Sequence, residues 1–209
     1  MKVKCYMIKN LVFDLGQVIF SFKRQYMVER YVSDEEDSAL LQSVVFDRMY
    51  WDKLDSGTLT DEEALSLMLP RLPKRLHTVA EKIYCNWIYH IPEIEGMTDL
   101  IREMKERFGI RAFVLSNMVK RFVDHSYEMP FLTEFEKCIF SSVCGLTKPN
   151  IEIFEHLCRE CAIAPEETLF IDDRQINIDA AEAFGIKGYR FTGKAEPLRE
   201  YLIDLLSNQ

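Results

Sequence analysis

The chain has 209 residues, of which 48% are hydrophobic, and a formal net charge of −8. This length suits one large or two small domains, and the hydrophobic fraction is sufficient for a buried core. The negative charge argues against nucleic-acid partners, which require a basic stripe, and against binding to anionic membranes.

The first expected element is a short strand at residues 11–13, which ends at Asp14. A carboxylate at the mouth of a buried strand is unfavourable unless something nearby needs its charge. The apolar run at residues 168–171 ends in the same way, at Asp172 and Asp173. These acids are therefore candidates for a functional site.

Residues 21–91 have a mostly helical pattern without a convincing strand signal. Thr60 and Glu63 form a capping box, which predicts a helix that runs to Leu69 and is ended by Pro70. A further helix is expected at about residues 74–89. This helical block interrupts the chain directly after its first strand.

The carboxy-terminal half alternates helices and strands, which predicts an α/β fold with a doubly wound parallel sheet. The acids then fall at carboxyl ends of strands, where open α/β sheets bind ligands. The expected strands and helices cover residues 97–108 (helix), 111–115 (strand), 137–140 (strand), 150–161 (helix), 168–171 (strand), 175–184 (helix) and 186–190 (strand).

Two further motifs lie between the acids. Ser116 and Asn117 follow an expected strand, and a hydroxyl with backbone N–H groups at such a position binds phosphate oxygens. Lys148 is followed by a proline and an expected helix. A lysine there neutralises charge on a carboxylate or a phosphoryl group.

The ordered set of Asp14, Ser116-Asn117, Lys148 and Asp172-Asp173 resembles the four motifs of the haloacid dehalogenase superfamily. Most members of that superfamily are magnesium-dependent phosphatases. The resemblance extends over essentially the whole chain and implies a Rossmann-like core at residues 1–20 and 93–209. It also implies an inserted all-helical cap at residues 21–92, joined by linkers near residues 20–23 and 90–95, which allow it to move as a lid.

The resemblance also implies a role for each motif. Asp14 becomes the nucleophile that forms an aspartyl-phosphate, and Lys148 pairs with it and with the phosphoryl group. Ser116 and Asn117 bind phosphate, Asn117 through its backbone or its amide. The implied cofactor is Mg²⁺, held by Asp14, the Gly16 carbonyl and Asp173, with Asp172 acting mainly through a water. Asn177 is a candidate to support the acidic loop.

Gly16 departs from the family pattern, because most of these phosphatases have there a second aspartate that protonates the leaving oxygen. The lost general acid is worth about 10²–10⁴ in rate. Either the enzyme is slow, or another group supplies the proton, or the leaving group does not need one. The last alternative points to a substrate with a good leaving group, such as a sugar 1-phosphate, an acyl phosphate or an aryl phosphate. The start of the chain also resembles a subgroup that includes sugar-1-phosphate phosphatases.

Substrate choice is expected to lie in the cap, where Arg24, Tyr50, Trp51 and Lys53 are candidates. For Tyr50 and Trp51, packing in the core of the cap is the simpler interpretation. None of the four histidines has ligand spacing.

Six cysteines are scattered along the chain: Cys5, Cys85, Cys138, Cys144, Cys158 and Cys161. The last four could in principle form a zinc site. The wide spacing of the first two and the helical position of the last two favour buried free thiols. The first residues lack a secretory signal and no apolar run is long enough to cross a membrane, so a cytoplasmic protein is expected.

The favoured prediction is a magnesium-dependent phosphatase that acts on a small phosphorylated metabolite. A 2-haloacid dehalogenase shares the nucleophile and the lysine, but such enzymes need no metal and lack the adjacent acids Asp172 and Asp173. A metabolite-binding protein that has lost catalysis is a third possibility, and Gly16 is its best support. Nothing in the sequence sets the oligomeric state.

Overall fold

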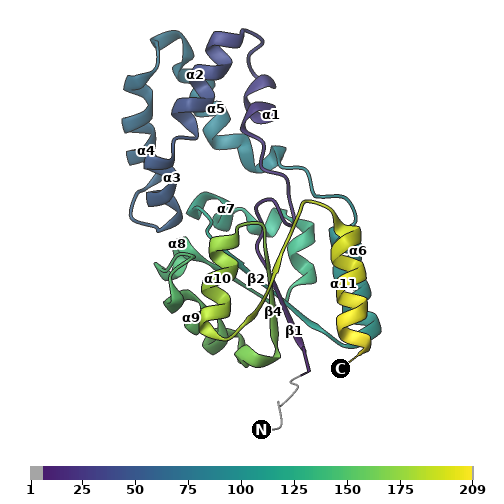
Figure 1. Cartoon of the computed structure of the whole chain (residues 1–209). Coiled ribbons are helices and arrows are strands. Elements are labelled where there is room, and N and C mark those ends of the chain that lie inside the picture. Colours follow the sequence, from purple (N-terminus) through teal and green to yellow (C-terminus); the bar gives the residue numbers. More distant parts are fainter. Residues whose placement is uncertain (1–6, 209) are drawn as a thin grey trace.

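The computed structural model describes residues 7–208, and its centre is a parallel sheet of five strands in the order β3-β2-β1-β4-β5 (Figure 1). The strands are β1 (Asn10–Phe13), β2 (Arg111–Ser116), β3 (Lys137–Phe140), β4 (Thr168–Asp172) and β5 (Lys187–Arg190). The predicted strands are confirmed to within one residue at each end.

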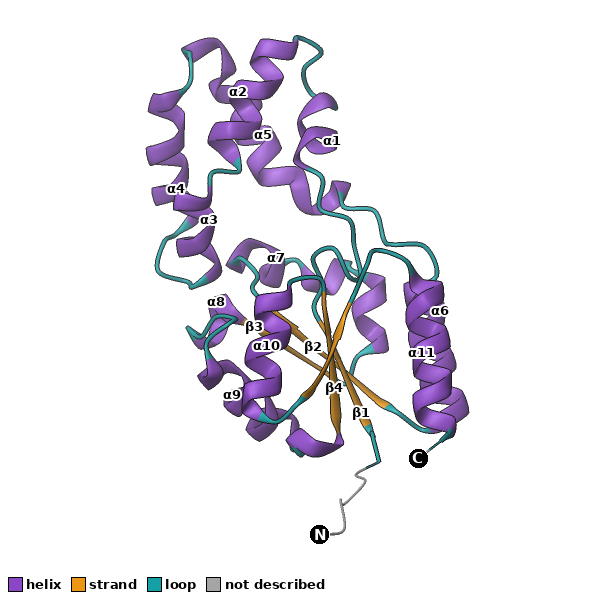
Figure 2. Cartoon of the chain, viewed as in Figure 1, coloured by secondary structure: helices purple, strands orange, loops and turns teal. Residues whose placement is uncertain are grey.

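Side chains alternate between the two faces along each strand, and in the central strands they are mostly apolar on both faces. Helices therefore cover both faces of the sheet. On one face, Leu11 and Phe13 belong to a core shared with α6 (Met97–Phe108) and α11 (Ala195–Ser207). On the other face, Val12 packs with α9 (Ile151–Cys161) and α10 (Gln175–Phe184). The doubly wound parallel α/β fold that the sequence predicts is confirmed (Figure 2).

A layer of helices lies beyond the carboxyl ends of the strands (Figures 1 and 2). It consists of α1 (Arg24–Glu29), α2 (Glu35–Val45), α3 (Arg48–Asp55), α4 (Asp61–Met68) and α5 (His77–Asn86), with short 3-10 turns at Leu69–Arg71, Lys74–Leu76 and Trp87–His90. The capping box between Thr60 and Glu63 is present as predicted. The helix expected at about residues 74–89 is confirmed in α5, but its ends at Lys74–Leu76 and Trp87–His90 are 3-10 turns.

Two antiparallel linkers join the helical layer to the sheet. The N–H of Ser21 donates to the carbonyl of Pro92 over 2.8 Å, and the N–H of Ile94 donates to the carbonyl of Ile19 over 2.8 Å. Both linkers lie near the predicted boundaries at residues 20–23 and 90–95. The division into a core at residues 1–20 and 93–209 and a cap at residues 21–92 stays a prediction, and residues 1–6 lie outside the described structure.

In the α/β part, three helices and three 3-10 turns were not predicted. The helices are α7 (Lys120–Asp124), α8 (Ser141–Cys144) and α11, and the turns are Ser126–Glu128, Pro130–Glu134 and Pro165–Glu167. Most are too short to show a periodic pattern. No helix between residues 7 and 208 is long and apolar enough to cross a membrane.

The cysteines that the structure describes are all free thiols: Cys85, Cys138, Cys144, Cys158 and Cys161. Among the described residues, none of them belongs to a metal-ligating group. Of these five thiols Cys161 is buried and the others are half-buried, and Cys5 lies outside the described residues. The preference for free thiols over a zinc site stays a prediction.

Gly188 in β5 allows α10 to pack closely on the sheet, and we predict that Gly188→Ala destabilises the protein. A Cβ at this position would lie 2.5 Å from Cγ2 of Ile178. Overpacking of this kind costs about 1–3 kcal/mol, which urea unfolding would measure. Ile178→Ala removes the clashing methyl, so the double variant should lose less stability than the sum of the single variants. Strictly additive losses would contradict this account.

Candidate active site

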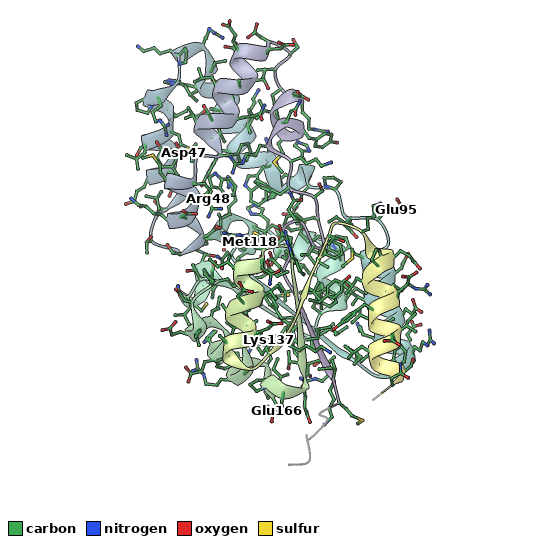
Figure 3. The ribbon with its side chains drawn as sticks, in the orientation of Figure 1. Asp47, Arg48, Glu95, Met118, Lys137 and Glu166 are labelled. Carbon is green, nitrogen blue, oxygen red and sulfur yellow. The ribbon has the colours of Figure 1, made fainter. Side chains whose placement is uncertain are left out.

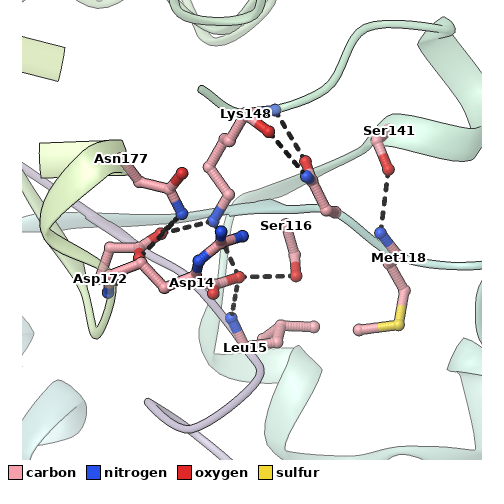
Figure 4. Close-up of polar contacts among 10 residues, drawn as sticks. Asp14, Leu15, Ser116, Met118, Ser141, Lys148, Asp172 and Asn177 are labelled. Carbon is pink, nitrogen blue, oxygen red and sulfur yellow. Dashed lines mark hydrogen bonds and ion pairs between the residues drawn. The ribbon is translucent and has the colours of Figure 1, made fainter. Parts of the chain in front are cut away.

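The four predicted motifs meet at the carboxyl edge of the sheet (Figure 4). Asp14 directly follows β1, Ser116 ends β2, and Asp172 ends β4, which are neighbouring strands. Lys148 reaches the same point from the loop between α8 and α9. Parallel strands bring their carboxyl ends to one edge, so residues more than 100 positions apart come into contact.

Asp14 is a buried carboxylate, and all of its polar partners contact one of its two oxygens. Its Oδ1 accepts hydrogen bonds from the Ser116 hydroxyl at 2.7 Å and from the N–H of Leu15 at 2.7 Å, and lies 3.0 Å from Nζ of Lys148. No residue in the described part of the chain donates a hydrogen bond to Oδ2. The donors therefore fix the carboxylate and leave one oxygen available for reaction or for a metal.

Lys148 is a fully buried ammonium group placed between two carboxylates. Its Nζ lies 2.7 Å from Oδ2 of Asp172 and 3.0 Å from Oδ1 of Asp14, and 2% of its side chain is exposed. The side-chain amide of Asn117 holds the lysine backbone, with its Nδ2 3.0 Å from the Lys148 carbonyl and its Oδ1 2.8 Å from the Lys148 N–H. The amide of Asn117 thus positions Lys148, and phosphate binding by Asn117 stays a prediction for its backbone.

The two adjacent acids face different surroundings. Asp172 is fully buried, and it accepts hydrogen bonds from the N–H of Arg174 at 2.8 Å and from Nδ2 of Asn177 at 3.0 Å. The supporting role expected of Asn177 is therefore confirmed. Asp173 is half-buried and lines the cavity described below. This difference agrees with the prediction that Asp173 binds a metal directly while Asp172 acts less directly.

The acidic group fits a divalent cation. One carboxylate oxygen from each of Asp14, Asp172 and Asp173 lies within 4.8 Å of the others. With the ammonium of Lys148, these groups carry a formal charge of −2, which one divalent ion balances. Hard oxygen donors of this kind suit Mg²⁺. Gly16 lines the same cavity, and its carbonyl as a ligand stays a prediction.

Burial and charge shift the pKa values in this cluster. Burial raises the pKa of Asp14 to about 6, against the attraction of Lys148. Burial works against the charge on Lys148, but the attraction of Asp14 and Asp172 outweighs it and raises the lysine pKa. Burial is the main cause that raises the pKa of Asp173, and repulsion from Asp172 raises it further. A carboxylate-rich site of this kind becomes more favourable when a cation enters it.

A cavity of about 500 Å³ opens above this cluster, between the helical layer and the sheet. Figure 3 shows Arg48 on the helical layer and Met118 on the α/β part, and both line the cavity. Of the substrate-contact candidates, Arg24 and Trp51 line the cavity. Tyr50 is 2% exposed and packs inside the helical layer, as the simpler interpretation predicted. Lys53 is exposed and is absent from the cavity wall.

Sequence reasoning missed four charged residues of the cavity wall: Arg48, Asp52, Asp55 and Arg174. The first three belong to α3, and Arg48 and Asp55 are its first and last residues. Nothing in the sequence indicated that this helix and the turn after it approach the sheet.

The family profile of haloacid dehalogenase-like hydrolases matches residues 8–185, so the chain belongs to this family. A sesquiterpene phosphatase of Aspergillus oryzae is 24% identical over 189 residues, which are 90% of this chain and 92% of that protein. A D-ribitol-5-phosphate phosphatase of Bacteroides thetaiotaomicron is 26% identical and covers 96% of this chain and 100% of that protein.

A haloacid dehalogenase family enzyme of Bacteroides thetaiotaomicron, solved with magnesium and inorganic phosphate, has a similar structure. It superposes with a TM-score of 0.68 at 23% identity, over 90% of this chain and 96% of that one. This similarity confirms the fold. Together with the family profile and the phosphatase relatives, it assigns the chain to the hydrolases, in the class that acts on phosphoric monoesters.

The acidic cluster predicts how Mg²⁺ binding responds to mutation. Asp173→Asn should weaken Mg²⁺ binding at least about 10–100-fold, the loss that even outer-shell changes cause, as measured by calorimetric titration. Asp179→Asn on α10 is the matched control, because it removes the same charge from an exposed side chain nearby. Equal affinities for the two variants would show that Asp173 is not a ligand.

Proposed function

We propose that the protein is a magnesium-dependent phosphatase that hydrolyses a small phosphorylated metabolite through an aspartyl-phosphate intermediate. The observation that carries this proposal is the buried carboxylate of Asp14 beside Lys148 and two further acids at the floor of a cavity. A nucleophile, a fixed cation and oxygen ligands for a metal are the groups that phosphoryl transfer requires.

In this proposal, Asp14 attacks the phosphorus atom and Lys148 compensates negative charge on the phosphoryl oxygens. Ser116 keeps the nucleophile oriented through its 2.7 Å hydrogen bond and binds the phosphoryl group in turn. Asn117 and Asp172 hold Lys148 in place from opposite ends of its side chain. Prepositioned charges in a buried site stabilise the transition state without reorganising during the reaction.

Mg²⁺ would be held by Asp14, Asp173 and the Gly16 carbonyl, with Asp172 acting through a water, and it would supply charge neutralisation and orientation of the phosphate. The helical layer, as a cap at residues 21–92, would exclude water from the bound ester. The paired linkers at residues 19–21 and 92–94 are where such a lid would bend.

The cavity supports a small substrate with mixed character. Its wall includes the aromatic rings of Phe22 and Trp51 and the guanidinium groups of Arg24 and Arg48. Sugar 1-phosphates stay candidates because an anomeric oxygen leaves more readily than an ordinary alcohol oxygen. The free thiols of the described cysteines agree with a reducing compartment, and so with the proposed cytoplasmic location.

The dehalogenase alternative has less support, because Asp172 and Asp173 both belong to the metal-ligating group. A pure binding protein has no use for a nucleophile held by three donors. A dehalogenase would share the pairing of Lys148 with Asp14, but not its second pairing with Asp172.

The proposed reaction predicts that purified protein releases inorganic phosphate from phosphate monoesters only when Mg²⁺ is present. A panel of sugar 1-phosphates, sugar-alcohol phosphates and aryl phosphates would define the substrate, with EDTA-treated protein as the control. Faster hydrolysis of sugar 1-phosphates than of alkyl phosphates of similar size would support a substrate with a good leaving group. Phosphate release at the same rate after EDTA treatment would contradict the role of the metal, and chloride release from 2-haloacids without Mg²⁺ would favour the dehalogenase.

Asp14→Asn should abolish turnover, with a loss of at least about 10³-fold, because the covalent intermediate cannot form. Binding of inorganic phosphate with Mg²⁺, followed by calorimetry, should change far less than the rate. Asp179→Asn serves as the charge-matched control. Near-normal turnover by the Asp14→Asn variant would rule out a covalent mechanism through Asp14.

A further inference from the structure

Gly16 leaves space where a catalytic side chain is missing. A Cβ built at Gly16 would meet no atom within 4 Å, so the cavity beside Asp14 is open at this point. The leaving oxygen of a phosphate ester needs a proton unless the leaving group is acidic, and that proton is worth about 10²–10⁴ in rate. If the enzyme supplies this proton, the donor must be another residue that lines the cavity.

Asp55 is a carboxyl group that the helical layer contributes to this cavity. It is the last residue of α3, and it lines the cavity together with Asp14, Gly16 and Lys148. Of the other three carboxyl groups that line the cavity, Asp14 and Asp173 are engaged as nucleophile and metal ligand in the proposed function, and Asp52 is paired with Arg48 at 2.8 Å. Asp55 comes from the opposite wall, which is the side from which a leaving group must depart.

The backbone of Asp55 is tied to the α/β core through Ser141 of α8. The Ser141 hydroxyl donates a hydrogen bond to the Asp55 carbonyl and accepts one from the N–H of Met118 at 2.9 Å. Met118 lies two residues after Ser116, so one serine connects the cap residue to the phosphate-binding loop. The position of Asp55 relative to Asp14 is therefore set by direct contacts.

Gly57 brings the same turn against the core. Its φ is +70°, and a Cβ there would lie 2.7 Å from the carbonyl oxygen of Ser142. Only glycine permits both this backbone conformation and this approach. The turn that carries Asp55 thus rests directly on α8.

The side chain of Asp55 is half-buried and, among residues 7–208, has no hydrogen-bond or ion-pair partner. Burial raises the pKa of Asp55 to about 7. The charged groups that act on it are Arg48 and Asp52 on its own helix, and Asp14 and Lys148 across the cavity. A carboxyl group whose pKa lies near 7 serves as both a proton donor and a proton acceptor at physiological pH.

We propose that Asp55 is the general acid and base of this enzyme, in place of the residue absent at Gly16; the inference rests on the proposed phosphatase function. As Asp14 attacks phosphorus, the bond between phosphorus and the leaving oxygen breaks and the Asp55 carboxyl proton passes to that oxygen. The alcohol leaves, and the Asp55 carboxylate then takes a proton from water as that water attacks the aspartyl-phosphate. Inorganic phosphate, the Asp14 carboxylate and the protonated Asp55 are restored.

A general acid carried by the cap extends the range of substrates. Because Asp55 protonates the leaving oxygen, the enzyme can hydrolyse phosphate esters of ordinary alcohols as well as esters with acidic leaving groups. It also couples chemistry to the cap, because the proton donor is in place only when the α3–α4 turn rests on α8.

Two aryl esters of nearly equal size separate this role from substrate binding: 4-nitrophenyl phosphate and phenyl phosphate, whose leaving phenol has a pKa of about 10. For Asp55→Asn, kcat/KM should fall about 10²-fold with phenyl phosphate and less than about fivefold with 4-nitrophenyl phosphate. Glu62→Gln on α4 is the control, because it removes one exposed negative charge from the same layer. Equal losses with both esters, or no loss with either, would overturn the assignment.

The wild-type protein provides a second test that needs no substitution. With phenyl phosphate, kcat/KM should fall as the pH rises above about 7, because the donor must be protonated for the first step. With 4-nitrophenyl phosphate this fall should be absent, while identical profiles for the two esters would contradict the assignment. If wild-type protein with Mg²⁺ released phosphate from neither ester nor from any metabolite of the panel, the phosphatase proposal itself would fail, which is a different result from uniform losses in Asp55→Asn.

Discussion

The contact on which the rest of this structure depends is the buried ammonium of Lys148 between the carboxylates of Asp14 and Asp172. Buried charges are unfavourable unless they are paired and hydrogen-bonded. Here every partner is supplied by the carboxyl edge of the sheet or its loops, so the sheet must form before the charges are satisfied. The cluster still has an excess of negative charge, which favours a divalent cation; the bound cation would then offset the repulsion between the carboxylates and a phosphoryl group.

A second constraint is the way in which the helical layer meets that edge. The layer is inserted after β1, and its linkers pair with each other beside the site. The turn at Gly57 touches α8, so the layer contacts the α/β core at a second point, separate from the linkers. An insertion of this kind allows residues from the layer to complete a site whose proposed nucleophile, Asp14, directly follows a strand of the sheet. The role proposed for Asp55 depends on this arrangement.

Much of the fold could be predicted because local patterns and tertiary structure agree. The strands around Asp14 and Asp172 are short apolar runs, and α6, α9 and α10 have continuous apolar faces. The helices α7 and α8 were missed because one turn is too short for periodicity to appear. The helix expected at residues 74–89 differs only at its ends, because the last turns of an α-helix often tighten into 3-10 geometry.

The sequence alone determined the nucleophile candidate, the lysine, the acid pair and the family, because these depend on the order and type of residues along the chain. Only the tertiary structure decided that Asn117 holds the Lys148 backbone and that Asp55 shares a cavity with Asp14. The physical reason is distance along the chain. Contacts between segments 30 to 100 residues apart depend on how helices pack and turns approach one another, and no local pattern encodes that geometry.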